Sequence, residues 1–435
     1  NFPSFSAGWR IDQEPFMKPV IAVSELKLRG GWGITGLNAI GIFPALQNSI
    51  LANEYPWQAV VQANGATYPF GNTISIGNAS YYNLLASTNL EWEKTKQVNI
   101  GLDFGLFNNT AEWYRRLTDN LILTIPTPLS FGYGGAGSQL NAASMKNTGV
   151  DLQVGYNQRH TKFTWSVTGN IGFIRNKILS LNTPNATIDA GSDADFGNGN
   201  MTRTVAGQPI QSFYGYVTDG IFQNQSEVDK APVQLSGTDP AKSTAPGDIR
   251  FKDLNGDGAI TSADRTFLGS YIPKYTYSLS YNANWHNFDL SVFFQGVQGN
   301  KIFNGTRVLR EGMARLFGAG TAVLDAWTPE HTNTDIPRAI SGDPNSNLRV
   351  SNRWIENGSY LRLKNLMIGY SLPGNTIRYI QSFRVYIASQ NLLTFTKYKG
   401  WDPEIGSKNT TLTNGIDYGQ YPAARSFQVG LQVGF

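Results

Sequence analysis

The sequence contains no cysteine in its 435 residues, which excludes disulfide bonds, thiolate nucleophiles and cysteine-based zinc sites. Charged residues make up only 15% of the chain, whereas a typical soluble domain carries about 25%. No run of about 18 consecutive apolar residues occurs, and this excludes membrane-spanning helices. The net charge of +4 is small and no block of basic residues is present, so the composition argues against a nucleic-acid-binding protein.

Histidine is also scarce, because only His160, His286 and His331 occur and they lie far apart in the sequence. His160 and His286 fall in turns expected between strands, so a catalytic triad is not predicted. The segment 132–137 matches the pattern G-x-G-x-x-G, but it lies in an expected loop and lacks the strand and helix that a dinucleotide site requires. The sequence therefore does not predict an enzyme.

Alternation of apolar and polar residues is the dominant pattern. From Phe427 to Phe435 the odd-numbered positions are apolar and the even-numbered positions are Gln or Gly. Two runs are imperfect: the phase slips near Lys364–Asn365, which suggests a β-bulge, and it breaks around Arg115–Leu117. Eleven strands are predicted, near residues 3–10, 25–35, 98–106, 111–125, 148–157, 163–174, 275–285, 288–297, 359–372, 382–394 and 426–435.

Most of these runs are about ten residues long, which is the length that a tilted strand needs to cross a bilayer and longer than the usual strand of a soluble sheet. Aromatic residues near strand ends form interfacial girdles in membrane barrels. Here Trp or Tyr lies near a predicted strand end at Trp9, Trp113, Tyr156, Trp165, Tyr275 and Trp285.

The connections between the predicted strands alternate between short and long, as the periplasmic turns and extracellular loops of outer-membrane barrels do. The predicted fold is therefore all-β, a transmembrane antiparallel β-barrel whose last strand ends on the periplasmic side. Short periplasmic turns are expected at 107–110, 158–162, 286–287 and 373–381, with a moderate one at 11–24. Long extracellular loops are expected at about 36–90, 126–147, 175–274, 298–358 and 395–425.

Eleven strands cannot close a bacterial barrel, because such barrels use even numbers of strands. An unpaired first strand would also leave an open edge in lipid, which is not tolerated. We therefore expect this chain to be part of a larger barrel, with any export signal outside it.

The segment 253–264 matches the loop of calcium sites, D-x-[DN]-x-[DN]-G with an acidic twelfth residue. Side chains at alternate positions would converge on the ion, and Gly258 would permit the sharp turn. The twelfth residue is Asp instead of the usual Glu, and the alternative interpretation is an Asn/Gly/Asp-rich turn without an ion. The expected Ca²⁺ ligands, which would rigidify an extracellular loop, are Asp253, Asn255, Asp257, the Ala259 carbonyl, Thr261 and Asp264.

Many aromatic residues fall in the expected long loops. Aromatic faces stack on sugar rings or on peptide side chains inside a concave site, although packing within an ordered loop explains each of them equally well. The candidates for contact with a substrate or a capping protein are Tyr55, Trp57, Tyr68, Tyr81, Tyr82 and Trp401.

Segments along nearly the whole chain resemble the SusC/RagA family of TonB-dependent transporters from Bacteroidetes, and they occur in that family's order. They include "LKLRGGWGITG" at 26–36, "NLEWEKTKQVNIGLDFGLF" at 89–107 and "MKNTGVDLQVGY" at 145–156. Others are "PGDIRFKDLNGDGAITSADRTFLGS" at 246–270, "AWTPEHTNTDIPRA" at 326–339, "NGSYLRLKNLMIGYSLP" at 357–373 and the terminal "SFQVGLQVGF".

This resemblance implies a 22-stranded barrel in the Gram-negative outer membrane, to which the chain contributes the C-terminal eleven strands, without the plug domain and the N-terminal strands. It implies TonB-dependent import of a bulky nutrient, usually an oligosaccharide (glycan) and sometimes an oligopeptide. The implied partners are a SusD-like surface lipoprotein, the TonB–ExbB–ExbD complex acting through the plug, and the barrel assembly machinery. Phe435 resembles the terminal residue that this machinery recognises.

Two alternatives remain at this point. A TonB-dependent receptor for a siderophore or vitamin is disfavoured by the calcium-type segment and by "DIPRA" at 335–339. A secreted calcium-binding β-sandwich, acting as an adhesin or lectin, would require its alternating strands to be covered by a second protein layer.

Overall fold

The computed structural model describes residues 1–20, 23–37, 60–70, 75–84, 87, 89–105, 109–125, 138–159, 162–183, 185–193, 196, 199–235, 244–313, 318–373, 379–406 and 413–434. Tyr55, Trp57, His160, Phe435 and the segment 132–137 lie outside these residues. For Tyr68, Tyr81 and Tyr82 only the backbone is described, within the hairpin of β3 (Val60–Phe70) and β4 (Ser75–Leu84).

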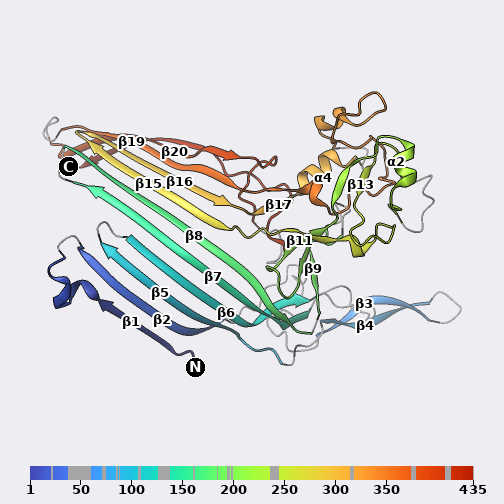
Figure 1. Cartoon of the computed structure of the whole chain (residues 1–435), viewed down its shortest axis with the longest axis horizontal. Coiled ribbons are helices and arrows are strands. Elements are labelled where there is room, and N and C mark those ends of the chain that lie inside the picture. The colour runs from blue at the N-terminus through green and yellow to red at the C-terminus, as the bar shows by residue number, and fades with distance from the viewer. Residues whose placement is uncertain are drawn as a thin grey trace.

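The largest element is an antiparallel sheet of eleven strands whose order in space is their order in the chain (Figure 1). This confirms all eleven predicted strands and the all-β fold class. The strands are β1 (Ser4–Arg10), β2 (Glu25–Leu37), β5 (Glu93–Gly105), β6 (Asn109–Ile125), β7 (Ser138–Gln158), β8 (Phe163–Leu181), β15 (Tyr275–Trp285), β16 (Phe288–Gln298), β19 (Tyr360–Ser371), β20 (Ser382–Thr396) and β22 (Ser426–Gly434).

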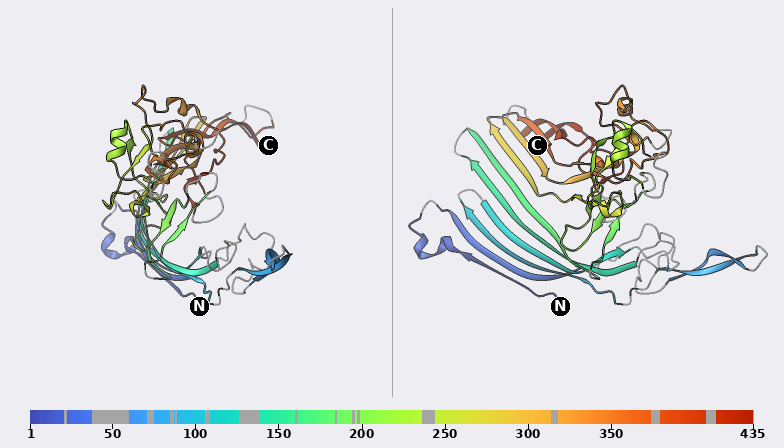
Figure 2. Two further views of the ribbon diagram at one scale, coloured as in Figure 1. Left: turned by 90° about the vertical axis from the view of Figure 1, so that its right-hand side faces the viewer. Right: turned by 45° about the vertical axis from the view of Figure 1, so that its right-hand side comes forward.

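The sheet is a curved single-layer wall with β1 and β22 at its edges (Figure 2). Because directly paired residues of neighbouring strands share a face, the register separates two surfaces. Trp285 pairs with both Phe163 and Phe288, and Phe288 pairs with Tyr370, so one aromatic row crosses four strands on the convex face. All four of these side chains are exposed. No second sheet covers this face in the part of the chain that the structure describes.

None of the helices in the described ranges is long and apolar enough to cross a membrane.

Two irregularities were expected from the sequence. The slip near Lys364–Asn365 is confirmed, because the pairing of β19 with both of its neighbours shifts there. The expected break around Arg115–Leu117 is wrong: β6 runs through these residues, and its pairing with β7 shifts instead between Thr118 and Leu121. Arg115 continues the convex face of β6, so its charge interrupts the apolar pattern without changing the phase of the strand.

The described residues of the long connections gather at one end of the sheet, here called the long-loop side. The turns from β1 to β2 and from β15 to β16 lie at the opposite end, called the short-turn side (Figure 1). The described residues within 185–274, 299–359 and 397–425 form a unit that we call the loop cluster. It contains the sheet β14–β11–β10–β9 (Thr266–Gly269, Ser212–Gly215, Thr202–Thr204, Ile188–Ala190), the pair β12–β13 (Thr218–Ile221, Ile249–Phe251), the sheet β18–β17–β21 (Ile355–Asn357, Lys301–Asn304, Ile416–Asp417) and the helices α2 (Gln225–Lys230) and α4 (Gly305–Glu311).

The loop cluster has a core of the kind found in soluble proteins. Phe213 and Phe303 are fully buried and pack with Trp354 and Ile416, although these residues come from four distant parts of the sequence. Polar caps order its short helices, since the side chain of Asn304 accepts a hydrogen bond from the backbone N–H of Arg307 at the start of α4.

Candidate functional site on the concave face and in the loop cluster

The concave face of the wall carries polar side chains in rows across the strands. One such row contains Arg29 of β2, Glu112 of β6, Asp151 of β7 and Thr276 of β15. Gly101 of β5 and Gly172 of β8 occupy the positions of this row on the strands between them. Arg29 Nε lies 3.1 Å from Asp103 Oδ1, and the same guanidinium also forms an ion pair with Glu112. This row borders an open hollow of about 600 Å³ lined by polar groups that also include Asn170, Ser278 and Gln295.

Small residues on this face allow long side chains to cross a strand. A Cβ at Gly369 would clash with the Asp289 carboxylate and with the Arg384 guanidinium. Because Gly369 leaves this space free, Arg384 of β20 reaches over β19 to Asp289 of β16, with Nε–Oδ1 and Nη2–Oδ2 distances of 2.9 and 2.6 Å. The concave face therefore holds fixed ion pairs that each span three strands, and it offers hydrogen-bonding groups to a polar occupant.

At the long-loop end of the wall, a buried ion network holds residues 402–404, which follow β20 in the chain. Arg362 of β19 is only 3% exposed, and its guanidinium nitrogens lie 2.7 Å from Asp402 Oδ1 and 2.7 Å from Glu404 Oε2. Lys364 Nζ lies 3.0 Å from the same Glu404. A buried charge of this kind requires its partners, so the wall and the loop cluster are fixed to each other at this point.

The Asp402 carboxyl accepts further hydrogen bonds from the backbone N–H groups of Glu404 and Ala423, both at 2.9 Å. Burial alone would raise the pKa of this carboxyl, but the hydrogen bonds from Glu404, Arg362 and Ala423 hold the pKa below its usual range. Asp402 therefore stays ionised and paired at neutral pH.

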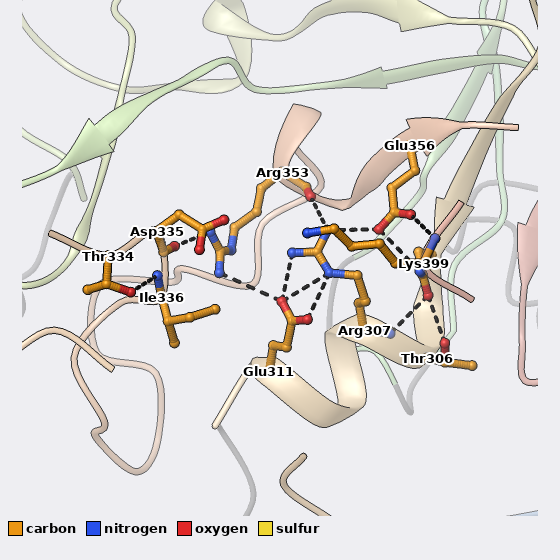
Figure 3. A network of polar contacts seen from close by, with 10 residues as sticks. Thr306, Arg307, Glu311, Thr334, Asp335, Ile336, Arg353, Glu356 and Lys399 are labelled. Carbon is orange, nitrogen blue, oxygen red and sulfur yellow. Dashed lines mark hydrogen bonds and ion pairs between the residues drawn. The ribbon is translucent and has the colours of Figure 1, made fainter. Parts of the chain in front are cut away.

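A second charged network lies inside the loop cluster around α4 (Figure 3). Arg307 forms ion pairs with Glu311 at 2.7 Å and with Glu356 at 2.8 Å, and Glu356 accepts a hydrogen bond from the backbone N–H of Lys399. Burial opposes the charged form of Arg307, yet the bonds to Glu311 and Glu356 raise the pKa of its guanidinium overall. This network ties α4 to β18 and to the start of the last loop.

The predicted calcium ligands form one compact turn, in which Gly256 and Gly258 have φ of +77° and +85°. The carboxylate of Asp253 accepts the N–H groups of Gly256 and Gly258, and that of Asp264 accepts those of Leu254 and Thr261. No three His, Asp or Glu side chains converge as metal ligands among the described residues. Each carboxylate oxygen has lone pairs for a cation beside its bonds to N–H groups, and calcium binding stays a prediction.

Of the six aromatic candidates, only Trp401 has a described side chain. It is 62% exposed and directly precedes Asp402 of the buried network. The sequence did not single out Arg362, Asp402, Glu404 or Arg307. The available indication was an arginine within an otherwise alternating strand, followed about 40 residues later by two acidic residues, and that spacing alone does not identify partners.

Comparison with known proteins gives matches over the whole chain. The family described as "TonB dependent receptor-like, beta-barrel" matches residues 1–392. "TonB-dependent receptor P3" of Formosa agariphila is 32% identical, and "TonB-dependent receptor SusC" of Bacteroides thetaiotaomicron is 30% identical. Both alignments cover 100% of this chain, and 42% and 40% of the relatives, so the chain spans about two fifths of their length.

Solved structures give the same result. The structure of the RagAB peptide transporter superposes with a TM-score of 0.76 at 25% identity, covering 100% of this chain and 43% of that one. The same importer in its "closed-closed" state gives a TM-score of 0.75.

Proposed function

Because this chain belongs to the TonB-dependent receptor-like β-barrel family, and so is part of an outer-membrane protein, we propose that this protein imports a bulky nutrient across the outer membrane. The nutrient is an oligosaccharide or an oligopeptide, and the long-loop side is extracellular. The observation that carries this proposal is the two-faced wall. Its convex face presents apolar side chains suited to lipid, while its concave face presents the ion pairs and amides of a polar passage.

The proposed partners follow from the same relatives. A SusD-like lipoprotein would cover the loop cluster, and TonB–ExbB–ExbD would supply energy through the plug domain of the whole protein. A peptide cargo is supported by the structural match to a peptide transporter, and a glycan by the similarity to SusC. The chain would act through binding and passage, because its relatives are named as receptors and transporters.

The experiment is growth and uptake in a strain that lacks the protein. We expect the deletion to abolish uptake of one fluorescently labelled oligosaccharide or oligopeptide, and loss of TonB to have the same effect. Re-expression of the protein should restore uptake. Unchanged uptake of all such nutrients, combined with a growth defect only under iron or vitamin limitation, would contradict the proposal and favour a siderophore or vitamin receptor.

We also propose that Ca²⁺ rigidifies the turn between Asp253 and Asp264. The spacing of the oxygen-bearing residues and the two left-handed glycines support it. In the detergent-purified protein, removal of Ca²⁺ with a chelator should increase protease cleavage between residues 250 and 270. The D253N/D257N variant should be cleaved equally with and without Ca²⁺. Identical cleavage of the unaltered protein under both conditions would exclude a structural ion.

A further inference from the structure

Four basic side chains gather on the convex face near its long-loop end, and we call them the outer basic patch: Arg115 of β6, Lys146 of β7, and Arg175 and Lys177 of β8. Arg115 and Arg175 each pair with Thr148 from opposite sides, and Lys146 pairs directly with Lys177. The four positions are therefore neighbours on three adjacent strands. Arg115, Arg175 and Lys177 are exposed, and Lys146 is partly exposed.

On β6, β7 and β8 the patch adjoins the apolar surface. The row on its short-turn side consists of Trp113, Val150, Phe173 and Tyr275, which pair with one another across four strands. The rings of Phe173 and Tyr275 lie 5.5 Å apart. Rings of this kind mark the boundary between hydrocarbon and head groups, so the four basic side chains lie at the depth of the head groups.

The charges of the patch have no ion-pair partner among the described residues. On the same face, Lys94 and Lys96 are paired, with Glu91 and Asp119 at 3.1 and 3.0 Å. Asp119 also accepts a hydrogen bond from Ser144, so its carboxylate is already engaged. Like charges at directly opposite positions destabilise a sheet, and Lys146 opposite Lys177 is such a pair. An anion from outside the chain would relieve this repulsion.

We propose that the outer basic patch binds the phosphate-bearing head group of a lipid in the outer leaflet. Guanidinium groups form paired hydrogen bonds to phosphate oxygens, and ammonium groups add point charges. Basic clusters next to a membrane attract anionic lipids in proportion to their charge. The acyl chains of the lipid would lie along the apolar rows below, over Val150 and Phe173.

The experiment uses the delipidated, detergent-purified protein and native mass spectrometry, with diphosphoryl lipid A as the probe. We expect the R115Q/K146Q/R175Q/K177Q variant to bind the probe about tenfold more weakly, or worse. The K94Q/K96Q variant is the matched control, because it removes two charges from the same face that are already paired. It should bind as the unaltered protein does.

Three results from the variants and competitors would each overturn the proposal. The first is equal binding of diphosphoryl lipid A by the fourfold variant and the unaltered protein. The second is inorganic phosphate displacing the lipid at equal concentration, which indicates a site for a free anion. The third is a change in oligomeric state without a change in lipid binding, which indicates a protein interface.

Heat-modifiable migration on a gel reports whether each variant is folded. If the fourfold variant fails this test, the K146Q/K177Q variant removes the facing pair alone. The unaltered protein also provides a test without substitutions, because it should bind diphosphoryl lipid A more tightly than monophosphoryl lipid A, and phosphatidylcholine least. Equal binding of the three lipids would contradict a phosphate-specific site. The result is independent of the transported nutrient, since the patch lies on the opposite face of the wall.

Discussion

The wall and the loop cluster use the same apolar residue types in opposite ways. On the convex face, Val429 is 76% exposed and Phe427 is 68% exposed, whereas Phe213 and Phe303 of the loop cluster are fully buried. In water, burial of apolar surface drives the packing of a core. In a bilayer, the acyl chains are themselves apolar. An apolar side chain on a strand is therefore solvated by lipid and does not have to pack in a protein core.

This difference also explains the two sequence patterns. A strand between lipid and a polar interior must alternate at every position, and a one-residue slip would reverse both faces. The loop cluster has no such constraint, because its core is assembled from separate segments. The two regions therefore predict different responses to the same kinds of substitution.

The largest expected effect is a cavity in the loop cluster. Phe213→Ala should lower the free energy of unfolding of the cluster by about 3–5 kcal/mol, because the surrounding core cannot collapse completely. Val429→Ala on the convex face should change stability by less than about 1 kcal/mol, since lipid or detergent chains fill the space. Hydrogen exchange of both variants in detergent measures this difference. Similar losses in the two regions would mean that the convex face depends on protein packing as the loop cluster does.

A charge on the convex face is expected to have the next largest effect. Val429 and its partner Ile387 lie near the middle of their strands, so Val429→Arg should cost about 2–4 kcal/mol and reduce the assembled fraction. Gln428→Arg, one position away on the concave face, should assemble normally. Heat-modifiable migration of membrane extracts compares the two variants. Equal assembly would mean that the faces are not different environments.

The smallest expected effect concerns pH at the junction of the two regions. The pKa of Asp402 is lower in the folded protein than in the unfolded chain. The ionised carboxylate therefore stabilises the fold above pH about 3.9, the pKa of an unfolded Asp, and this stabilisation is lost as the pH falls through the pKa of the folded state. Protease protection of the segment after β20 should therefore stay constant between about pH 8 and pH 5 and decrease only below about pH 4. Arg362→Gln removes one of the groups that lower this pKa, so protection should be lost at a higher pH. A loss of protection near pH 6 in the unaltered protein would point to a different titrating group.

The strands could be predicted from the sequence because each convex residue contacts the same apolar surroundings, and no distant partner has to be known. The bulge at Lys364 could be predicted for the same reason, because it moves the apolar–polar alternation by one position. The expected break at Arg115 was wrong. A basic side chain on the convex face, at the edge of the apolar band, interrupts the apolar–polar alternation of the sequence just as a change of strand phase would. The loop cluster could not be predicted, since the contact of Phe213 with Phe303 and Ile416, and the pairing of Arg362 with Asp402, depend on the folded arrangement of distant segments.

Lipid contact by one face of each wall strand can be tested directly, because this chain contains no cysteine. A nitroxide label is placed at single cysteines from Phe427 to Val433 in the protein reconstituted into bilayers, and its collisions with oxygen and with a water-soluble nickel chelate are measured. We predict a period of two, with positions 427, 429, 431 and 433 accessible to oxygen and positions 428, 430 and 432 accessible to the chelate. If the odd-numbered positions were inaccessible to both reagents, they would lie beneath a second layer of protein and would not contact lipid.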